Sequence, residues 1–255
     1  MKIIACIKQV PDSEAKVTAS GGQVSWGDAP LVINPFDEYA VEGALQQKEA
    51  TGATVTALCI GPESAKEALK HALAMGADEA ILVSDAALND LDTVGAAKVL
   101  AAAIQKIGAD IVVFGRQTLD NGAGLTPAQT ARVLGWPMLG LAGQIKVDGG
   151  SVQVERVLEE GRQSVKASMP AVLSVVQSIG EPRYPSFMGI RKASKANIPV
   201  WSLNDIGASA PAPMITRTEL MTPPVRDTAV EMIAGETPAE IAEKLADKII
   251  AEKVL

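Results

Sequence analysis

The chain has 255 residues, a formal net charge of −7, and a composition that is 47% hydrophobic but only 3% aromatic. This length can bury a large core in one domain or two small ones, and the acidic balance argues against a nucleic-acid binder, which needs a basic face. No apolar run reaches the roughly 18 residues that would cross a bilayer, and Lys8 and Gln9 interrupt the first apolar run too early for a signal peptide, so we expect a cytoplasmic protein without membrane insertion.

The first 135 residues alternate between strand and helix patterns. Buried strands are predicted over residues 2–10, 53–61, 79–84 and 109–117, and helices over 34–52, 62–76 and 92–108. In the first helix Asn34 can cap the N-terminus, Pro35 suits the first turn, and Asp37 and Glu38 favour the positive end of the dipole. Strands separated by helices of this length form βαβ units, so we predict an α/β fold with a Rossmann-like, doubly wound, mostly parallel sheet.

The pattern changes after residue 137. Residues 143–178 alternate polar and apolar residues around tight turns at 148–150 and 160–161, which predicts an antiparallel meander that extends the same sheet or forms a flap. Residues 208–230 carry four prolines and predict an extended arm. The chain ends in a predicted helix with a Thr237/Glu240 capping box, whose apolar stripe of Ile241, Leu245 and Ile249 either folds back on its own domain or reaches a neighbouring chain.

The residue types that usually carry catalysis are sparse. Cys6 and Cys59 each lie in an apolar strand pattern and are interpreted as small core residues, and His71, the one histidine, lies in a helical pattern and has a surface or packing role. No metal site, Ser/His/Asp set or spaced carboxylate pair stands out. We therefore expect a carrier or binding protein and not an enzyme.

Two glycine-containing segments are candidates for nucleotide binding. The segment SGGQVS (residues 20–25) resembles the SGGxDS loop of ATP pyrophosphatases, but it lacks the Asp and lies in a polar hairpin pattern, so a β-turn is the better interpretation. The segment FGRQTLDNGAGLTPAQTARVLG (residues 114–135) follows a buried strand and enters a helix, with Thr126 as N-cap and Pro127 as first helical residue. Such a loop is either a nucleotide site or an ordinary βα connection.

The segment GEPRYPSFMGIRKASK (residues 180–195) is basic within an acidic chain. It holds four Arg or Lys residues and one Glu around Phe187 and Met188, and its prolines and glycines predict a loop. Phe187 either lies at an exposed loop tip or folds back into its own core.

Several stretches, taken together, resemble the β-subunit of electron transfer flavoprotein. They run in order through most of the chain: IACIKQVPD (4–12), NPFDEYAVEGAL (34–45), LCIGP (58–62), ALAMGADEAILV (72–83), FGRQTLDNGAGLTPAQTA (114–131), LGWP (134–137), MPAVLSV (169–175) and EPRYPSFMGIRKA (181–193). The last is the most specific. Many family members read D-G-D-T-x-Q-V-G in the phosphate loop, where this chain reads D-N-G-A-G-L-T-P.

The resemblance implies a heterodimer and two cofactor sites. The α-subunit holds most of an FAD that the β-subunit covers in part, and the β-subunit also holds AMP, as in carriers of fatty-acid oxidation, or a second FAD, as in electron-bifurcating members. Phe36 aligns with an aromatic residue that approaches the flavin. The cofactor-binding residues carried over by alignment are Cys6, Asn34, Pro35, Phe36, Asp37, Ile60, Asp120, Asn121, Gly122, Ala123, Gly124, Leu125, Thr126, Pro127, Ala128, Gln129, Thr130 and Ala131.

The resemblance also implies the partners. Segment 180–195 corresponds to the loop that docks on a partner dehydrogenase, with Phe187 as the apolar anchor; the docking residues would be Arg183, Tyr184, Phe187, Met188, Arg191 and Lys192. Electrons would come from an acyl-CoA dehydrogenase or a similar enzyme and pass to a quinone-linked oxidoreductase. Residues 1–207 would form the nucleotide-binding domain, and residues 208–255 would form an arm and helix that pack on the α-subunit. A stand-alone adenine-nucleotide-binding regulator and an ATP-using enzyme remain as alternatives.

Overall fold

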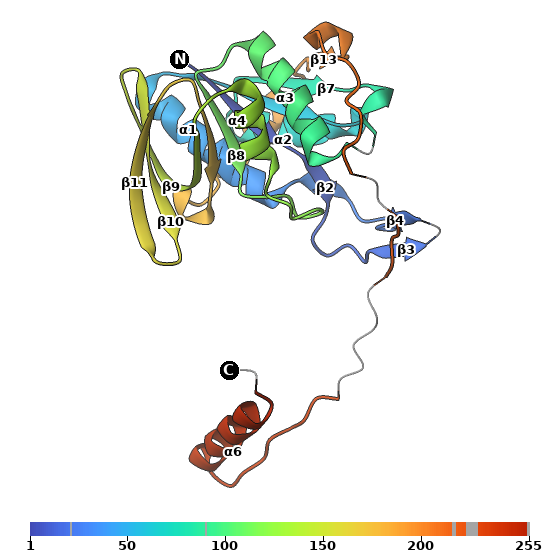
Figure 1. The fold of residues 1–255 in the computed structure, drawn as a ribbon, viewed down its shortest axis with the longest axis vertical. Helices are drawn as coiled ribbons and strands as arrows, with labels where there is room; N and C mark the ends of the chain where they lie inside the picture. The colour runs from blue at the N-terminus through green and yellow to red at the C-terminus, as the bar shows by residue number, and fades with distance from the viewer. Residues whose placement is uncertain (21, 90, 216–217, 223–228, 254–255) are drawn as a thin grey trace.

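The structure is a computed structural model that describes residues 1–20, 22–89, 91–215, 218–222 and 229–253. A nine-stranded sheet forms its centre, in the strand order β11-β10-β9-β12-β8-β1-β6-β7-β13 (Figure 1). The sheet strands are β1 (Lys2–Ile7), β6 (Thr54–Ile60), β7 (Glu79–Val83), β8 (Ile111–Gly115), β9 (Met138–Asp148), β10 (Ser151–Leu158), β11 (Gly161–Ser168), β12 (Ala171–Val175) and β13 (Val200–Trp201). The helices are α1 (Pro35–Thr51), α2 (Lys66–Met75), α3 (Thr93–Ile107), α4 (Thr126–Leu134), α5 (Phe187–Ala193) and α6 (Pro238–Ala251), with short 3₁₀ turns η1 (Glu63–Ala65), η2 (Ala86–Leu88), η3 (Gln177–Ile179) and η4 (Asn204–Ile206).

The sheet is doubly wound, as predicted. All neighbouring pairs from β9 to β13 are parallel. Alternate side chains of β1 point to opposite faces of the sheet. Ile3 and Ala5 pack in one apolar cluster with α1 and α2, whereas Ile4 and Cys6 pack in a second cluster with α3 and α4. The two helix layers therefore cover opposite faces of one sheet, as βαβ connections of constant hand require.

The antiparallel meander extends the main sheet, so the alternative of a separate flap is wrong. β10 pairs antiparallel with both β9 and β11, and the turn between β9 and β10 falls at residues 149–150. The chain then returns through β12, which runs parallel between β9 and β8. The sequence pattern did not distinguish the parallel strand β12 from the antiparallel meander, because MPAVLSV continues the apolar pattern of the meander.

Two small hairpins lie beside the main sheet at the start of the chain. β2 (Gln9–Pro11) pairs with β5 (Leu31–Ile33), and β3 (Thr18–Ser20) pairs with β4 (Gln23–Ser25). The segment SGGQVS is thus part of a polar hairpin, as expected, and not a strand-to-helix phosphate loop; residue 21 lies outside the described residues.

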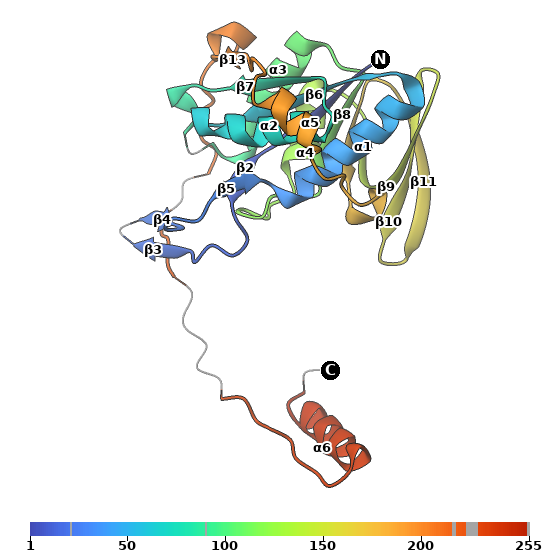
Figure 2. The ribbon, with the colours of Figure 1, turned by 180° about the vertical axis from the view of Figure 1, so that it is seen from behind.

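Segment 180–195 is not a loop throughout, which corrects the sequence interpretation. Residues 187–193 form α5, whose N-cap Ser186 accepts a hydrogen bond from the backbone of Gly189 at 2.9 Å. A Cβ at Gly189 would lie 2.3 Å from the carbonyl oxygen of Ala74, so this glycine lets α5 pack directly on α2 (Figure 2). Glycine favours turns in a sequence, but here it serves close helix packing.

The C-terminal segment first follows the domain and then leaves it. The Asp92 carboxylate, which caps α3 through Gly95, also accepts hydrogen bonds from the backbone of Met214 at 2.6 Å and of Ile215 at 3.2 Å. Further along, the Thr222 hydroxyl accepts from and donates to the backbone of Ala19 in β3. Residues 229–253 lie away from the sheet (Figure 1).

Helix α6 lies away from the sheet in Figure 1, so a position folded back on its own domain is not seen in this structure. Thr237 caps it by accepting a hydrogen bond from the backbone of Glu240, as predicted, and the Glu240 carboxylate accepts one from the backbone of Glu236 at 2.9 Å. None of its described residues is buried. Within the described residues, no helix combines the length and apolar character needed to cross a membrane.

Candidate functional site

The candidate site lies where the winding of the sheet reverses. From β1 the chain adds β6 and β7 on one side, and then crosses to add β8 on the other. The connections that leave the carboxyl ends of β1 and β8 therefore diverge. Open α/β sheets bind ligands in a crevice at this point, and we call the region between these connections the crevice. The predicted cofactor residues lie at this edge, at the ends of β1 and β6, in the loop after β8, or in the first turns of α1 and α4.

The base of the crevice is a close contact between the end of β8 and the start of α1. A Cβ at Gly115 would lie 2.5 Å from the carbonyl oxygen of Phe36 and 2.6 Å from the Asp37 carboxyl group, so only glycine fits. The buried Asp37 carboxyl accepts a hydrogen bond from the backbone of Lys8 at 2.8 Å. Burial raises the pKa of Asp37 to about 7, although hydrogen bonds from Asn34 and from the backbone of Lys8 and Gly115 act to lower it.

This raised pKa predicts a pH dependence of folding stability. In the unfolded chain Asp37 ionises near its ordinary value of 3.8, whereas the folded chain holds the proton up to about pH 7. Stability contributed by the protonated group is therefore complete below pH 4 and is lost as the pH rises towards 7, by up to about 1.4 kcal/mol per pH unit. Asp37→Asn mimics the protonated group, so denaturant unfolding at pH 4 to 7 should show a smaller decrease for the variant. Equal pH profiles of the two proteins would contradict the assignment.

Asn34 has a different role from the predicted cap. It occupies the N-cap position of α1, but its side chain makes no cap hydrogen bond. Its amide instead donates to the carbonyl oxygen of Gln117 at 2.9 Å, and its carbonyl oxygen accepts from the backbone of Leu119 at 3.1 Å. Asn34 thus fixes the loop after β8 to the start of α1, a contact between residues more than 80 positions apart that no local pattern indicates.

One ion pair crosses the crevice. The Lys8 ammonium lies 2.6 Å from the Asp120 carboxylate, and both side chains remain partly accessible. Sequence reasoning selected Asp120 and missed Lys8, although Lys8 follows the buried strand β1 and so carries the same positional signal. A cation and a carboxylate at this edge suit the phosphate and the ribose hydroxyls of a nucleotide.

The loop before α4 is exposed and open. Gly122 and Gly124 have φ values of +65° and +63°, which favour glycine, and residues 121–125 are all exposed. Leu125 occupies the N-cap of α4 and Thr126 is its first residue, so the predicted cap at Thr126 is displaced by one position. Pro127 therefore falls at the second helical position, where its missing N–H costs no internal hydrogen bond.

The first turns of α4 contain unpaired polar atoms. Within the described residues, the Thr130 hydroxyl and the Gln129 side-chain oxygen are buried without a hydrogen-bond partner. Pro127, Thr130 and Ala131 are buried, whereas Ala128 is exposed. Buried polar atoms are nearly always paired in proteins, so the unpaired atoms fit an additional group at this end of α4.

Cys6 and Ile60 lie at the ends of β1 and β6. Cys6 is buried and unpaired with Cys59, and burial, followed by the charge of Asp37, raises the pKa of its thiol well above the ordinary value. Cys6 is thus an inert wall residue, because the nucleophilic form of a cysteine is the thiolate. Ile60 is half-buried at the end of β6.

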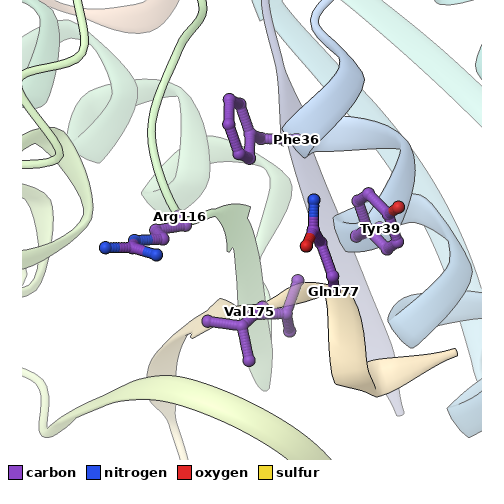
Figure 3. Close-up of a pocket in the computed structure, with 6 residues that line it drawn as sticks. Phe36, Tyr39, Arg116, Val175 and Gln177 are labelled. Atoms are coloured by element: carbon purple, nitrogen blue, oxygen red, sulfur yellow. The ribbon is translucent and has the colours of Figure 1, made fainter. Parts of the chain in front are cut away.

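A second hollow lies between the start of α1 and the ends of β8 and β12. Figure 3 shows that Phe36 and Tyr39 project from α1 while Arg116 projects from the loop after β8, with Gln177 between them. The cavity measures about 100 Å³ and is completed by Val175 and Val176. This volume is well below the roughly 300 Å³ at which ligand pockets begin, so the hollow can receive only an edge of a larger ligand.

The predicted docking residues divide into an outward and an inward group. Tyr184, Phe187 and Met188 are 93%, 81% and 70% exposed, and Arg191 and Lys192 are exposed beside them on α5. The alternative that Phe187 folds into its own core is therefore wrong. Arg183 instead turns inward, to Glu42 and Glu49 of α1.

Comparison with known proteins agrees with this geometry. A family model described as "Electron transfer flavoprotein domain" matches residues 26–206. The electron transfer flavoprotein subunit beta of Megasphaera elsdenii is 34% identical over the whole of both chains. The caffeyl-CoA reductase-Etf complex subunit CarD of Acetobacterium woodii is 35% identical, again over the whole of both chains, and the subunit beta of Bacillus subtilis is 31% identical over 99% of this chain and 98% of its own length.

Proposed function

The chain belongs to the electron transfer flavoprotein family as a β-subunit, and we propose that it carries electrons from a dehydrogenase to a downstream acceptor as part of a heterodimer with an α-subunit. When bound, FAD supplies the redox chemistry, and this chain contributes binding, shielding and docking. The single observation that carries the proposal is the pairing of a nucleotide-type crevice at the switch point with a separate, exposed apolar helix, α5.

The small hollow and the crevice suggest how the chain contributes to cofactor binding. The small hollow with Phe36 and Arg116 would cover one edge of an FAD that the α-subunit mainly holds. The crevice with Lys8, Asp120 and the start of α4 would hold a second adenine nucleotide, AMP or FAD. Phosphate would lie at the positive end of α4 near Lys8, and Asp120 would accept from ribose hydroxyls.

The test is co-expression with the α-subunit followed by heat extraction of the bound cofactors. One flavin together with one adenine mononucleotide per heterodimer would support the simple carrier. A single flavin with no other adenine nucleotide would contradict a second site in this chain. No flavin in a stable heterodimer would contradict the proposed function itself.

Thr126 offers a finer test of the crevice. Its side chain is half-buried at the first position of α4 and makes no cap hydrogen bond. If the hydroxyl donates to a bound phosphate, Thr126→Ala should weaken nucleotide binding by about 1 kcal/mol, or roughly fivefold, as measured by calorimetric titration of the nucleotide-free heterodimer. Thr51→Ala, at the far end of α1, is the matched control, because its hydroxyl donates only to the Gln47 backbone. Equal affinities of the two variants would place the nucleotide elsewhere.

The docking partner is proposed to be an acyl-CoA dehydrogenase or a similar enzyme, with a quinone-linked oxidoreductase as acceptor. The exposed aromatic Phe187 with Arg191 and Lys192 at its rim has the composition of a small transient interface, in which one apolar anchor dominates and charges speed encounter. The reductase in the name of the Acetobacterium woodii complex supports a CoA-thioester enzyme as the partner class.

Electron bifurcation with a second FAD is a second candidate function. The similarity to a subunit of the caffeyl-CoA reductase-Etf complex favours it over a regulator without an α-subunit. Two flavins per heterodimer in the extraction above would select it. A stand-alone regulator is less well supported, because α6 leaves an apolar stripe that is not buried against any part of the chain that the structure describes.

A further inference from the structure

A buried ion pair holds the segment that carries α5 to the middle of α1. The Glu42 side chain is only 7% exposed. Arg183 donates to both of its oxygens, from Nε at 2.8 Å and from Nη2 at 3.0 Å, and the Arg183 backbone N–H donates to Oε2 at 3.2 Å. This two-pronged geometry is the strongest form of an arginine–carboxylate contact and fixes direction as well as distance.

Neighbouring groups complete the cluster. Gln46 donates to Glu42 at 3.2 Å and to the carbonyl oxygen of Ile179 at 3.1 Å, and Arg183 Nη1 lies 2.5 Å from Glu49. Burial alone would raise the pKa of Glu42, but the hydrogen bonds from Arg183 and Gln46 outweigh it and hold this pKa below its ordinary value. The hydrogen bonds to Glu42 and Glu49 in turn raise the pKa of Arg183. The guanidinium group is therefore used within the chain, unlike the exposed cations of α5.

The docking helix is held at two places a short distance apart. Arg183 fixes the chain before α5, four residues before its first residue, Phe187, and Gly189 lets the helix itself pack against Ala74 of α2. Tyr184 between these points is almost fully exposed, so it adds little to the attachment. The direction in which Phe187 projects is thus set by the contacts to α1 and α2.

We propose that Arg183 is a positioning residue for docking: through Glu42 and Glu49 it holds α5 in the orientation that presents Phe187 to the dehydrogenase, and it does not contact the dehydrogenase itself. The inference rests on the proposed function. Its physical basis is preorganisation, since a helix already held in its bound orientation loses less freedom on binding. Because α1 begins at the candidate nucleotide crevice, the same helix supports both sites.

The variant to test is Arg183→Lys in the α/β heterodimer. Lysine keeps the positive charge beside Glu42 but cannot make the two-pronged contact. The probe is an acyl-CoA dehydrogenase from the same genome that reduces the wild-type heterodimer. We expect the dissociation constant to rise about 10-fold, flavin content to stay unchanged, and hydrogen exchange of the Gly189 and Ile190 amides in α5 to accelerate. Glu49→Gln weakens only the exposed end of the cluster, so it should raise the dissociation constant and the exchange rate by less than Arg183→Lys does. It replaces Arg183→Lys in the test if that variant does not fold.

A double variant separates positioning from direct contact. If Arg183 acts through the placement of Phe187, Arg183→Lys should have almost no further effect on binding in a Phe187→Ala background. In the wild-type background, the loss of affinity caused by Arg183→Lys should persist at high salt. Arg191→Gln is the control for a rim charge, with an additive effect that high salt removes. Additive, salt-sensitive losses for Arg183→Lys, or unchanged exchange in α5, would overturn the inference. If the wild type binds no dehydrogenase and Phe187→Ala changes nothing, the proposed function fails and the docking role of Arg183 fails with it. Accelerated exchange in Arg183→Lys would then still show that Arg183 holds α5 in place.

Discussion

Replacing Phe187 with alanine should weaken docking to the dehydrogenase by roughly 2–4 kcal/mol, which corresponds to about 30- to 1000-fold in affinity. The ring is 81% exposed at the first position of α5, while the inner face of that helix, Gly189 and Ala193, makes the packing contacts with the domain. Truncation of the ring therefore removes a contact with the partner and none with the core. Kinetic titration of the dehydrogenase with the heterodimer measures the effect.

The melting temperature and flavin content of the Phe187→Ala heterodimer should equal those of the wild type, since the side chain is solvated. Phe187→Leu is the matched variant that keeps an apolar anchor, and it should retain most of the affinity. Charge reversal at Arg191 and Lys192 should instead slow association and lose its effect at high salt. A drop of several degrees in melting temperature with normal electron transfer would identify Phe187 as a structural residue and remove the docking assignment.

Removal of residues 223–255 should release the α-subunit. The deletion takes away α6, whose Ile241, Leu245 and Ile249 have no buried position in this chain, and leaves the Asp92 and Ala19 contacts with residues 214–222 intact. Full burial of an exposed aliphatic side chain contributes roughly 1.5–3 kcal/mol, but Ile241 and Ile249 are already half-buried, so we expect heterodimer affinity to fall at least about 100-fold. Analytical ultracentrifugation of the mixed subunits measures it.

The domain itself should keep its melting temperature after this deletion, because α6 buries nothing against the sheet. The combined substitutions Ile241→Ser, Leu245→Ser and Ile249→Ser in the full-length chain should reproduce the loss of affinity. The control substitutions Glu243→Gln and Asp247→Asn, at exposed positions of α6, should not. Unchanged affinity of the deleted chain for the α-subunit would show that the arm has another role.

Much of the architecture follows from the sequence alone. The alternation of apolar strands and amphipathic helices predicts the parallel sheet and the order of its elements, and strand-to-helix loops at 34–37 and 116–126 mark the edge where the crevice forms. These features depend on neighbouring residues, whose periodicity and turn chemistry are written directly in the chain. The motifs from IACIKQVPD to EPRYPSFMGIRKA also indicate the family to which the chain belongs.

Other features depend on contacts between distant residues, and only the tertiary structure decides them. Asn34 resembles a cap in sequence yet holds a loop 83 to 85 residues away, and Arg183, next to an exposed docking surface, turns inward to a glutamate 141 residues earlier. Periodicity cannot distinguish these outcomes, because a polar side chain can satisfy its hydrogen bonds locally, in water or across the fold. The sequence thus determined which elements form and at which edge of the sheet their ends meet. The packing of α1, α2 and α5 decided which face of segment 180–195 contacts α1 and which face is exposed to a partner.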